Sequence, residues 1–191
     1  MAKNRMEAFS DGVWAIIITI MVLELHASEA ATWAALRTEA PIFLSYVLSF
    51  IYVGIYWNNH HHLLHATQQV NGGVLWANLH LLFWLSLVPF VTAWMGRTFF
   101  APLPVALYGA VLLMAALAYG ALVLVLIRTN GPDSAVAQAA GPDRKGVVSI
   151  LCYTASIPLA FVSPWLSGAL YMSVVLLWLI PDRNIESQLH P

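Results

Sequence analysis

Three charged side chains and a serine lie together at the start of an otherwise apolar stretch: Arg5, Glu7, Ser10 and Asp11. Ionisable groups at membrane depth are costly, so they usually face protein or water and pair with another group. One interpretation is a helix cap, in which Ser10 or Asp11 accepts hydrogen bonds from free N–H groups. Ser10 and Asp11 do not indicate a hydrolase, because adjacent residues point in different directions around a helix and the sequence has no oxyanion motif. We expect no enzyme.

Four histidines form a second candidate group: His60, His61, His62 and His65. His61 and His65 are one helical turn apart, the spacing that can chelate zinc or copper. No cysteine or carboxylate accompanies the run, so we predict hydrogen bonding at a membrane edge, with no metal and no cofactor. Two alternatives stay open: a proton- or metal-coupled transporter built on residues 60–65, and a membrane oxidoreductase that uses these histidines and His80 as haem ligands.

The elements that must position these groups lie in lipid. Of the 191 residues, 60% are hydrophobic and 9% charged, and the mean hydropathy is +0.75. Soluble domains carry about 25% charged residues, so the composition indicates an integral membrane protein. The formal net charge is −1 and no glycine-rich phosphate loop is present, so no nucleic acid is expected as a partner. A single cysteine, Cys152, excludes a disulfide within one chain.

Six apolar runs divide the chain, each near the roughly 20 residues that cross a bilayer as a helix. They lack the period-2 alternation of strands, and lipid forces backbone groups to pair within a segment. The sequence therefore predicts an all-α fold with six transmembrane helices in one domain over residues 1–191. Prolines predict helix starts at Pro41 and Pro104 and kinks at Pro89 and Pro158, and residues 130–145 predict a flexible loop. The predicted spans are 9–25, 41–61, 74–94, 104–127, 146–165 and 167–180.

The distribution of basic residues predicts the topology. With six spans, an internal amino terminus places six basic residues inside and two outside, which satisfies the positive-inside rule. Both termini of this multi-pass chain are therefore expected in the cytoplasm. The inner set is Lys3, Arg5, Arg128, Arg144, Lys145 and Arg183, and the outer set is Arg37 and Arg97.

The first span has two different faces when its residues are placed at about 100° intervals around a helix. One face is aliphatic with a single hydroxyl, which is by default ordinary helix packing. The other face is expected to bury a polar anchor, Asp11, against neighbouring helices. The first face holds Gly12, Ile16, Thr19, Ile20 and Leu23, and the second holds Asp11, Trp14, Ile18 and Val22.

The first span resembles the opening helix of a known family. The motif Arg5-x-x-x-Phe9-Ser10-Asp11, followed by IIITIMVLEL, is similar to the RxxxFSD signature of the transmembrane protein 175 family of potassium channels. The resemblance extends to the six-span layout of the bacterial members. It also includes the segments WNNHHH (57–62), NLH (78–80) and LVPF (87–90). The TVGYG filter loop of ordinary potassium channels is absent from the sequence.

This resemblance implies a homotetramer in which four copies of the first helix surround a path for potassium ions. The apolar constriction maps to Ile16 and Leu23, a hydroxyl ring maps to Thr19, and Ile20 lies at the edge of the path. An apolar ring blocks ions by dewetting, and potassium loses hydration water more readily than sodium. Membrane lipid is the other partner implied, and the location implied is the plasma membrane of a prokaryote.

The resemblance also implies a hydrogen-bond network that holds the Ser-Asp signature. Histidines of the second and third spans are expected to bond to Ser10 and Asp11. The candidates are His80 and one residue among His60, His61 and His62, and the register between the helices leaves that choice open.

Overall fold

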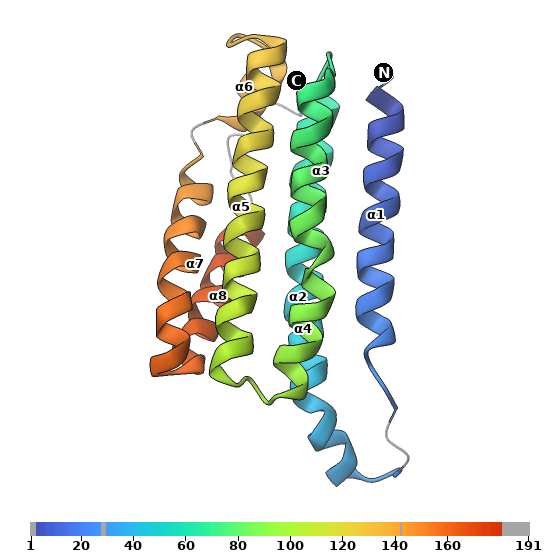
Figure 1. The fold of residues 1–191 in the computed structure, drawn as a ribbon, viewed down its shortest axis with the longest axis vertical. Coiled ribbons are helices and arrows are strands. Elements are labelled where there is room, and N and C mark those ends of the chain that lie inside the picture. Colours follow the sequence, from blue (N-terminus) through green and yellow to red (C-terminus); the bar gives the residue numbers. More distant parts are fainter. Residues whose placement is uncertain (1–2, 28–29, 142, 181–191) are drawn as a thin grey trace.

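The computed structural model describes residues 3–27, 30–141 and 143–180, and every regular element in these segments is a helix. Most of the helices run alongside one another as a bundle (Figure 1). The helices are α1 (Lys3–Leu23), α2 (Trp33–Ala66), α3 (Gly72–Ser86), α4 (Val88–Arg97), α5 (Pro102–Asn130), α6 (Ala135–Ala140), α7 (Arg144–Val162) and α8 (Pro164–Leu179).

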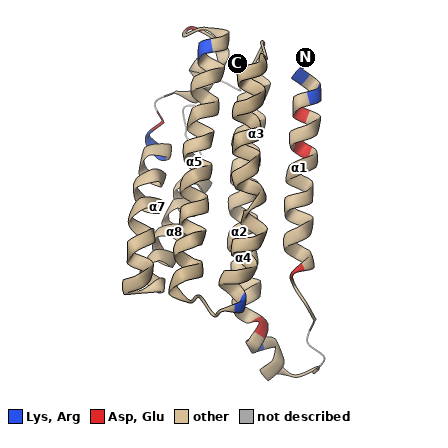
Figure 2. Ribbon diagram, viewed as in Figure 1, with Lys and Arg blue, Asp and Glu red and all other residues tan. Residues whose placement is uncertain are grey.

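The arrangement confirms an all-α membrane protein with six spans. Helices α1, α2, α5 and α7 are each long and apolar enough to cross a bilayer, and so are α3 and α4 taken together over 72–97. Helix α8 is apolar but has 16 residues, about 24 Å of helix, so it is the shortest span. Charged residues lie mainly toward the two ends of the bundle (Figure 2).

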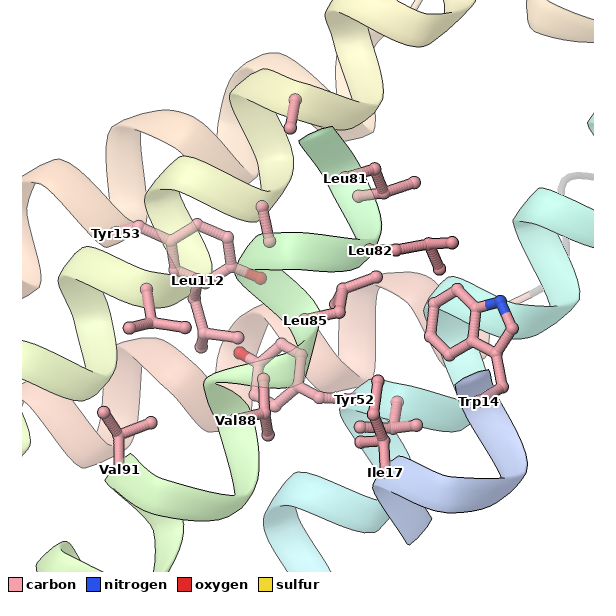
Figure 3. Packing of buried hydrophobic residues seen from close by; sticks show 14 of the residues in the cluster. Trp14, Ile17, Tyr52, Leu81, Leu82, Leu85, Val88, Val91, Leu112 and Tyr153 are labelled. Atoms are coloured by element: carbon pink, nitrogen blue, oxygen red, sulfur yellow. The ribbon is translucent and has the colours of Figure 1, made fainter. Parts of the chain in front are cut away.

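The interior of the bundle is apolar and dense. Fully buried side chains of α2, α3, α5 and α7 make up much of it, and include Val53, Leu81, Leu85, Ala115 and Ala160. Helix α1 lies at one edge of the bundle and packs on α2, α3 and α4 (Figure 1). Its contribution to the core includes Trp14 and Ile17, which lie close to α2 and α3 (Figure 3). The opposite side of α1 is exposed, with no helix of the described segments packed on it.

Two helices begin earlier than the hydropathy predicts. Helix α1 starts at Lys3 and not near residue 9, so the charged motif lies inside the helix. Helix α2 starts at Trp33, where the Thr32 hydroxyl accepts a hydrogen bond from the Ala35 N–H at 3.2 Å. The predicted start at Pro41 is therefore wrong, because Pro41 lies within α2. At 34 residues, α2 is about 51 Å long, so its first turns extend past the ~30 Å hydrocarbon layer (Figure 1).

The proline predictions have different outcomes. The third span breaks at Leu87, which separates α3 from α4, and Pro89 occupies the first turn of α4. The kink expected at Pro89 is therefore confirmed. Pro158 lies inside α7, which is assigned as one helix, and the kink expected there stays a prediction. The flexible loop expected over 130–145 is wrong in part, because residues 135–140 form α6, in which Val136 is fully buried.

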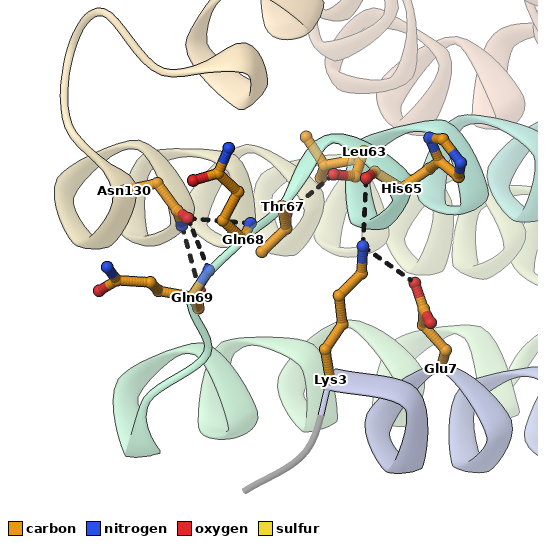
Figure 4. A network of polar contacts seen from close by, with 8 residues as sticks. All are labelled: Lys3, Glu7, Leu63, His65, Thr67, Gln68, Gln69 and Asn130. Carbon is orange, nitrogen blue, oxygen red and sulfur yellow. Dashed lines mark hydrogen bonds and ion pairs between the residues drawn. The ribbon is translucent and has the colours of Figure 1, made fainter.

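The turn between α2 and α3 is fastened to the end of α5. The Asn130 side-chain oxygen accepts hydrogen bonds from the N–H groups of Gln68 and Gln69, at 3.1 and 2.8 Å (Figure 4). Asn71 also donates to the Thr129 hydroxyl at 3.0 Å. These hydrogen bonds therefore fix the position of the end of α2, which the start of α1 contacts.

Candidate functional site

The serine of the signature is an interior residue of α1. Ser10 is fully buried, and its hydroxyl donates to the Met6 carbonyl one turn earlier at 2.8 Å. Free N–H groups occur only in the first turn of a helix, and Ser10 and Asp11 lie beyond that turn. The interpretation of Ser10 or Asp11 as a helix cap is therefore wrong. The polar start of α1 therefore serves contacts with neighbouring helices.

A chain of buried hydrogen bonds joins α1 to α3 and α2. The Asn78 amide donates to the Ser10 hydroxyl at 3.0 Å, and the Asn78 oxygen lies 2.7 Å from His60 Nε2. All three side chains are at least 98% buried. Since an amide oxygen can only accept, His60 carries a proton on Nε2 and donates it. The bond to Ser10 holds the position of α1, because the buried Asn78 amide N–H would lose its acceptor if that helix moved.

A second contact holds the other residue of the signature. The indole N–H of Trp57 donates to the Asp11 carboxylate at 3.0 Å, and the Trp57 ring stacks on His61 with 5.7 Å between centroids. Asp11 is exposed in the single chain. The predicted burial of Asp11 is therefore wrong, and its partner is a tryptophan of α2.

His80 lies in a different place from the one predicted. It is exposed on α3, and its Nε2 accepts a hydrogen bond from the Trp84 indole one turn later at 3.0 Å. Among the described contacts, Asn78 and His60 bond to each other and Asn78 reaches Ser10, so His80 does not anchor the signature. The sequence contained a signal for Asn78, because an amide inside an apolar span needs a partner.

The predicted aliphatic stripe is on the open side of α1. The exposed fractions are 57% for Ile16, 44% for Ile20 and 74% for Leu23, and Thr19 is exposed as well. The Thr19 hydroxyl donates to the Ile16 carbonyl at 3.0 Å. Because that bond uses the only hydroxyl proton, the lone pairs of the Thr19 oxygen remain available to a cation.

The buried side of α1 differs from the predicted face. It consists of residues spaced by three or four positions: Met6, Ser10, Trp14, Ile17 and Met21. Of the predicted set, only Trp14 is fully buried, at 2% exposure. Ile18 is half-buried and Val22 is 44% exposed. The centre of the buried face is therefore rotated from Asp11 to Ser10, while Arg5 and Phe9 of the signature are exposed.

The histidine run does not form a complete metal centre. In residues 3–27, 30–141 and 143–180, no group of three or more His, Cys, Asp or Glu side chains is arranged to hold an ion. His60 and His80 each have Nε2 in a hydrogen bond, so neither offers that atom to a haem iron. His61, His62 and His65 are exposed near the end of α2. The geometry favours neither the transporter nor the oxidoreductase alternative.

The fold and the site define a multi-pass membrane protein whose first helix is anchored by polar contacts on one side and open on the other. Residues 5–89 match the family model described as endosomal/lysosomal potassium channel TMEM175. A potassium channel of Chryseobacterium sp. (strain P1-3) is 53% identical over 189 residues, which cover 99% of this chain and 98% of that protein. The chain belongs to the TMEM175 family.

Further comparisons agree on the fold. A potassium channel of Streptomyces collinus (strain DSM 40733 / Tue 365) is 33% identical over 172 residues, covering 84% of each chain. The crystal structure of a lysosomal potassium-selective channel TMEM175 homolog from Chamaesiphon minutus superposes with a TM-score of 0.82 at 24% identity. That superposition covers 92% of this chain and 95% of the other.

Proposed function

We propose that the chain is a potassium channel and not an enzyme, and that it conducts as a homotetramer around four copies of α1. The observation that carries the proposal is the open side of α1, where an uncharged stripe including Ile16 and Leu23 is exposed at the edge of the subunit. The name of the 53% identical relative, potassium channel, supports the same function.

Two exposed polar groups of α1, Thr19 on the open side and Asp11 beside the contact with α2, favour an aqueous path over lipid around this helix. Asp11 is exposed and lies about two turns inside α1, where a carboxylate facing hydrocarbon would be costly. Thr19 presents oxygen lone pairs at mid-helix, which lipid does not use. Symmetric assembly through α1 supplies the missing partner, because each open side then faces the same axis.

Conduction follows from the order of side chains along the stripe. Four Ile16 side chains form an apolar ring that excludes ions when it is narrow and dry. Leu23 forms a second ring about 10 Å further along the axis, seven residues at 1.5 Å each. The Thr19 oxygens between the rings replace part of the water that an ion loses, which favours potassium because it is dehydrated at lower cost than sodium.

The anchor contacts hold the ring at a defined width. The bonds from Asn78 to Ser10 and from Trp57 to Asp11 attach α1 to α3 and α2. Rotation of α1 by one residue, about 100°, would carry Ile16 off the axis and break both bonds. The polar residues of the signature therefore act on conduction indirectly, by positioning.

The proposed setting is the plasma membrane of a prokaryote, with both termini in the cytoplasm. The basic residues Lys3, Arg5 and Arg128 lie at the end of the bundle where α1 begins (Figure 2). Arg37 and Arg97 lie at the opposite end. By the positive-inside rule, this asymmetry supports a cytoplasmic position for the start of α1. Arg183 of the predicted inner set lies outside the described residues.

Potassium flux from liposomes that contain the purified chain tests the proposal. Ile16→Asn should raise the flux, because polar side chains keep a narrow ring wet. The matched control is Leu151→Asn, at a position 64% exposed on α7, away from α1 (Figure 1). Equal flux and equal potassium-to-sodium preference in Ile16→Asn and the unmodified chain would refute the assignment of α1 to the pore.

A further inference from the structure

The end of α2 carries two exposed histidines on one face. The imidazole centroids of His61 and His65 are 6.3 Å apart, one helical turn along α2. Their neighbour His60 is buried and bonded to Asn78, so it belongs to the anchor of α1 and not to this exposed pair. The anchor described above leaves His65 without a role.

Two imidazoles at this spacing match the requirements of first-row transition metals. With nitrogen-to-metal distances of about 2.1 Å, small side-chain rotations from the observed separation bring one nitrogen of each ring to a shared ion. No third ligand is present in the described parts of the chain, so water would complete the coordination. Such a site takes up and releases its ion, and it selects Cu²⁺, Ni²⁺ or Zn²⁺ over Mg²⁺ and Ca²⁺, which prefer oxygen ligands.

We propose that His61 and His65 bind a divalent transition-metal ion at the end of α2, and that the ion acts on α1 through Trp57. The Trp57 ring is stacked on His61 and its N–H holds Asp11 of α1. A bound metal fixes the rotamer of His61. Because the Trp57 ring stacks on His61, the metal thereby also restricts the Trp57 side chain that donates to Asp11. This regulatory part rests on the proposed channel function, whereas the binding part does not.

The charges around the pair are compatible with a bound cation. The Lys3 ammonium lies 3.1 Å from the His65 carbonyl oxygen and 3.7 Å from the Glu7 carboxylate (Figure 4). Its charge is therefore compensated by Glu7, and its contact is with the backbone of His65. Replacing the His65 side chain leaves this contact in place.

Binding is tested by calorimetry on the purified full chain, freed of any polyhistidine tag, with Cu²⁺, Ni²⁺, Zn²⁺ and Mg²⁺. The unmodified chain should bind the first three in the order Cu²⁺ above Ni²⁺ and Zn²⁺, and Mg²⁺ should give no signal. His65→Ala should weaken binding about tenfold or more, comparable to or above the loss on removing an outer-shell partner. The matched control is His26→Ala, because His26 is an exposed histidine that follows the end of α1, far from the end of α2. No binding, or equal losses in His65→Ala and His26→Ala, would overturn the site.

The regulatory part is tested by potassium flux with Ni²⁺ added on the side where α1 begins. The ion should change the flux of the unmodified chain and of His26→Ala, and should have no effect on His65→Ala, whose metal-free flux stays normal. Binding without any change in flux would overturn the coupling through Trp57. Absence of flux without metal would instead contradict the channel function, so the two failures are distinguishable.

Discussion

Replacing Asn78 with leucine should weaken the attachment of α1 without changing the volume of the core greatly. The change removes two buried hydrogen bonds, to Ser10 at 3.0 Å and to His60 at 2.7 Å. Hydrogen bonds between membrane helices contribute about 0.6 kcal/mol on average and up to about 1.7 kcal/mol. The buried Nε2 of His60 is also left unpaired, which costs about 1–3 kcal/mol. We therefore expect the free energy of unfolding to fall by about 2–4 kcal/mol.

A double-mutant cycle separates this contact from general damage. The free energy of unfolding in mixed micelles is measured for Asn78→Leu, Ser10→Ala and the double variant, and we expect a coupling energy of about 0.6–1.7 kcal/mol. The control pairs Asn78→Leu with Ser167→Ala, a buried serine whose hydroxyl donates to the Ser156 carbonyl at 2.7 Å. That control pair should be additive within about 0.5 kcal/mol. Additivity of Ser10→Ala and Asn78→Leu would refute the anchor.

Three further predictions concern packing and the ends of the bundle. Gly96→Ala should destabilise the chain by about 1–3 kcal/mol, because the new Cβ would lie 2.8 Å from a backbone carbon of α2. The control, Gly54→Ala, adds a Cβ that meets nothing within 4 Å, so it should stabilise the chain by about 0.5–1 kcal/mol. Thermal unfolding that ranks the two glycine variants the other way would contradict the packing of α4 on α2. Arg97→Gln breaks an exposed ion pair with Glu24 and should change stability by less than about 1 kcal/mol, with the difference lost at 1 M salt. Asn130→Ala removes the acceptor of the Gln68 and Gln69 N–H groups and should speed amide hydrogen exchange at the α2–α3 turn. Unchanged exchange at this turn would contradict its attachment to α5.

The six spans could be predicted because lipid requires long apolar helices, and a hydropathy profile detects long apolar segments. The ends of the helices could not, because hydropathy detects the apolar part of a helix and not its hydrogen bonding. Helix α1 continues back through polar residues to Lys3, whose ammonium donates to the His65 carbonyl of α2. Helix α2 begins at a local cap, Thr32, well before the apolar run.

Periodicity alone predicts that Ile16 and Leu23 share one face of α1, and their exposure confirms that they do. Periodicity does not predict that this face is open, because an aliphatic stripe is by default a helix-packing surface. The role of Ile16 and Leu23 as pore lining stays a prediction. For the anchor, the sequence predicts only that polar side chains of the second and third spans bond to Ser10 and Asp11. Ser10 and Asn78 are 68 positions apart, and which side chain of α3 reaches Ser10 depends on the relative depth of two helices. Sequence periodicity contains no information on that depth, which is why His80 was a mistaken candidate.

The most direct test of the central claim is the accessibility of position 16 during conduction. The chain has a single cysteine, so Cys152→Ala provides a background without thiols that should still conduct potassium. In that background, a charged thiol reagent should block the potassium flux of Ile16→Cys and leave that of Leu151→Cys unchanged. Flux through Ile16→Cys that persists after its thiol is shown to be fully modified would contradict a conduction path lined by α1.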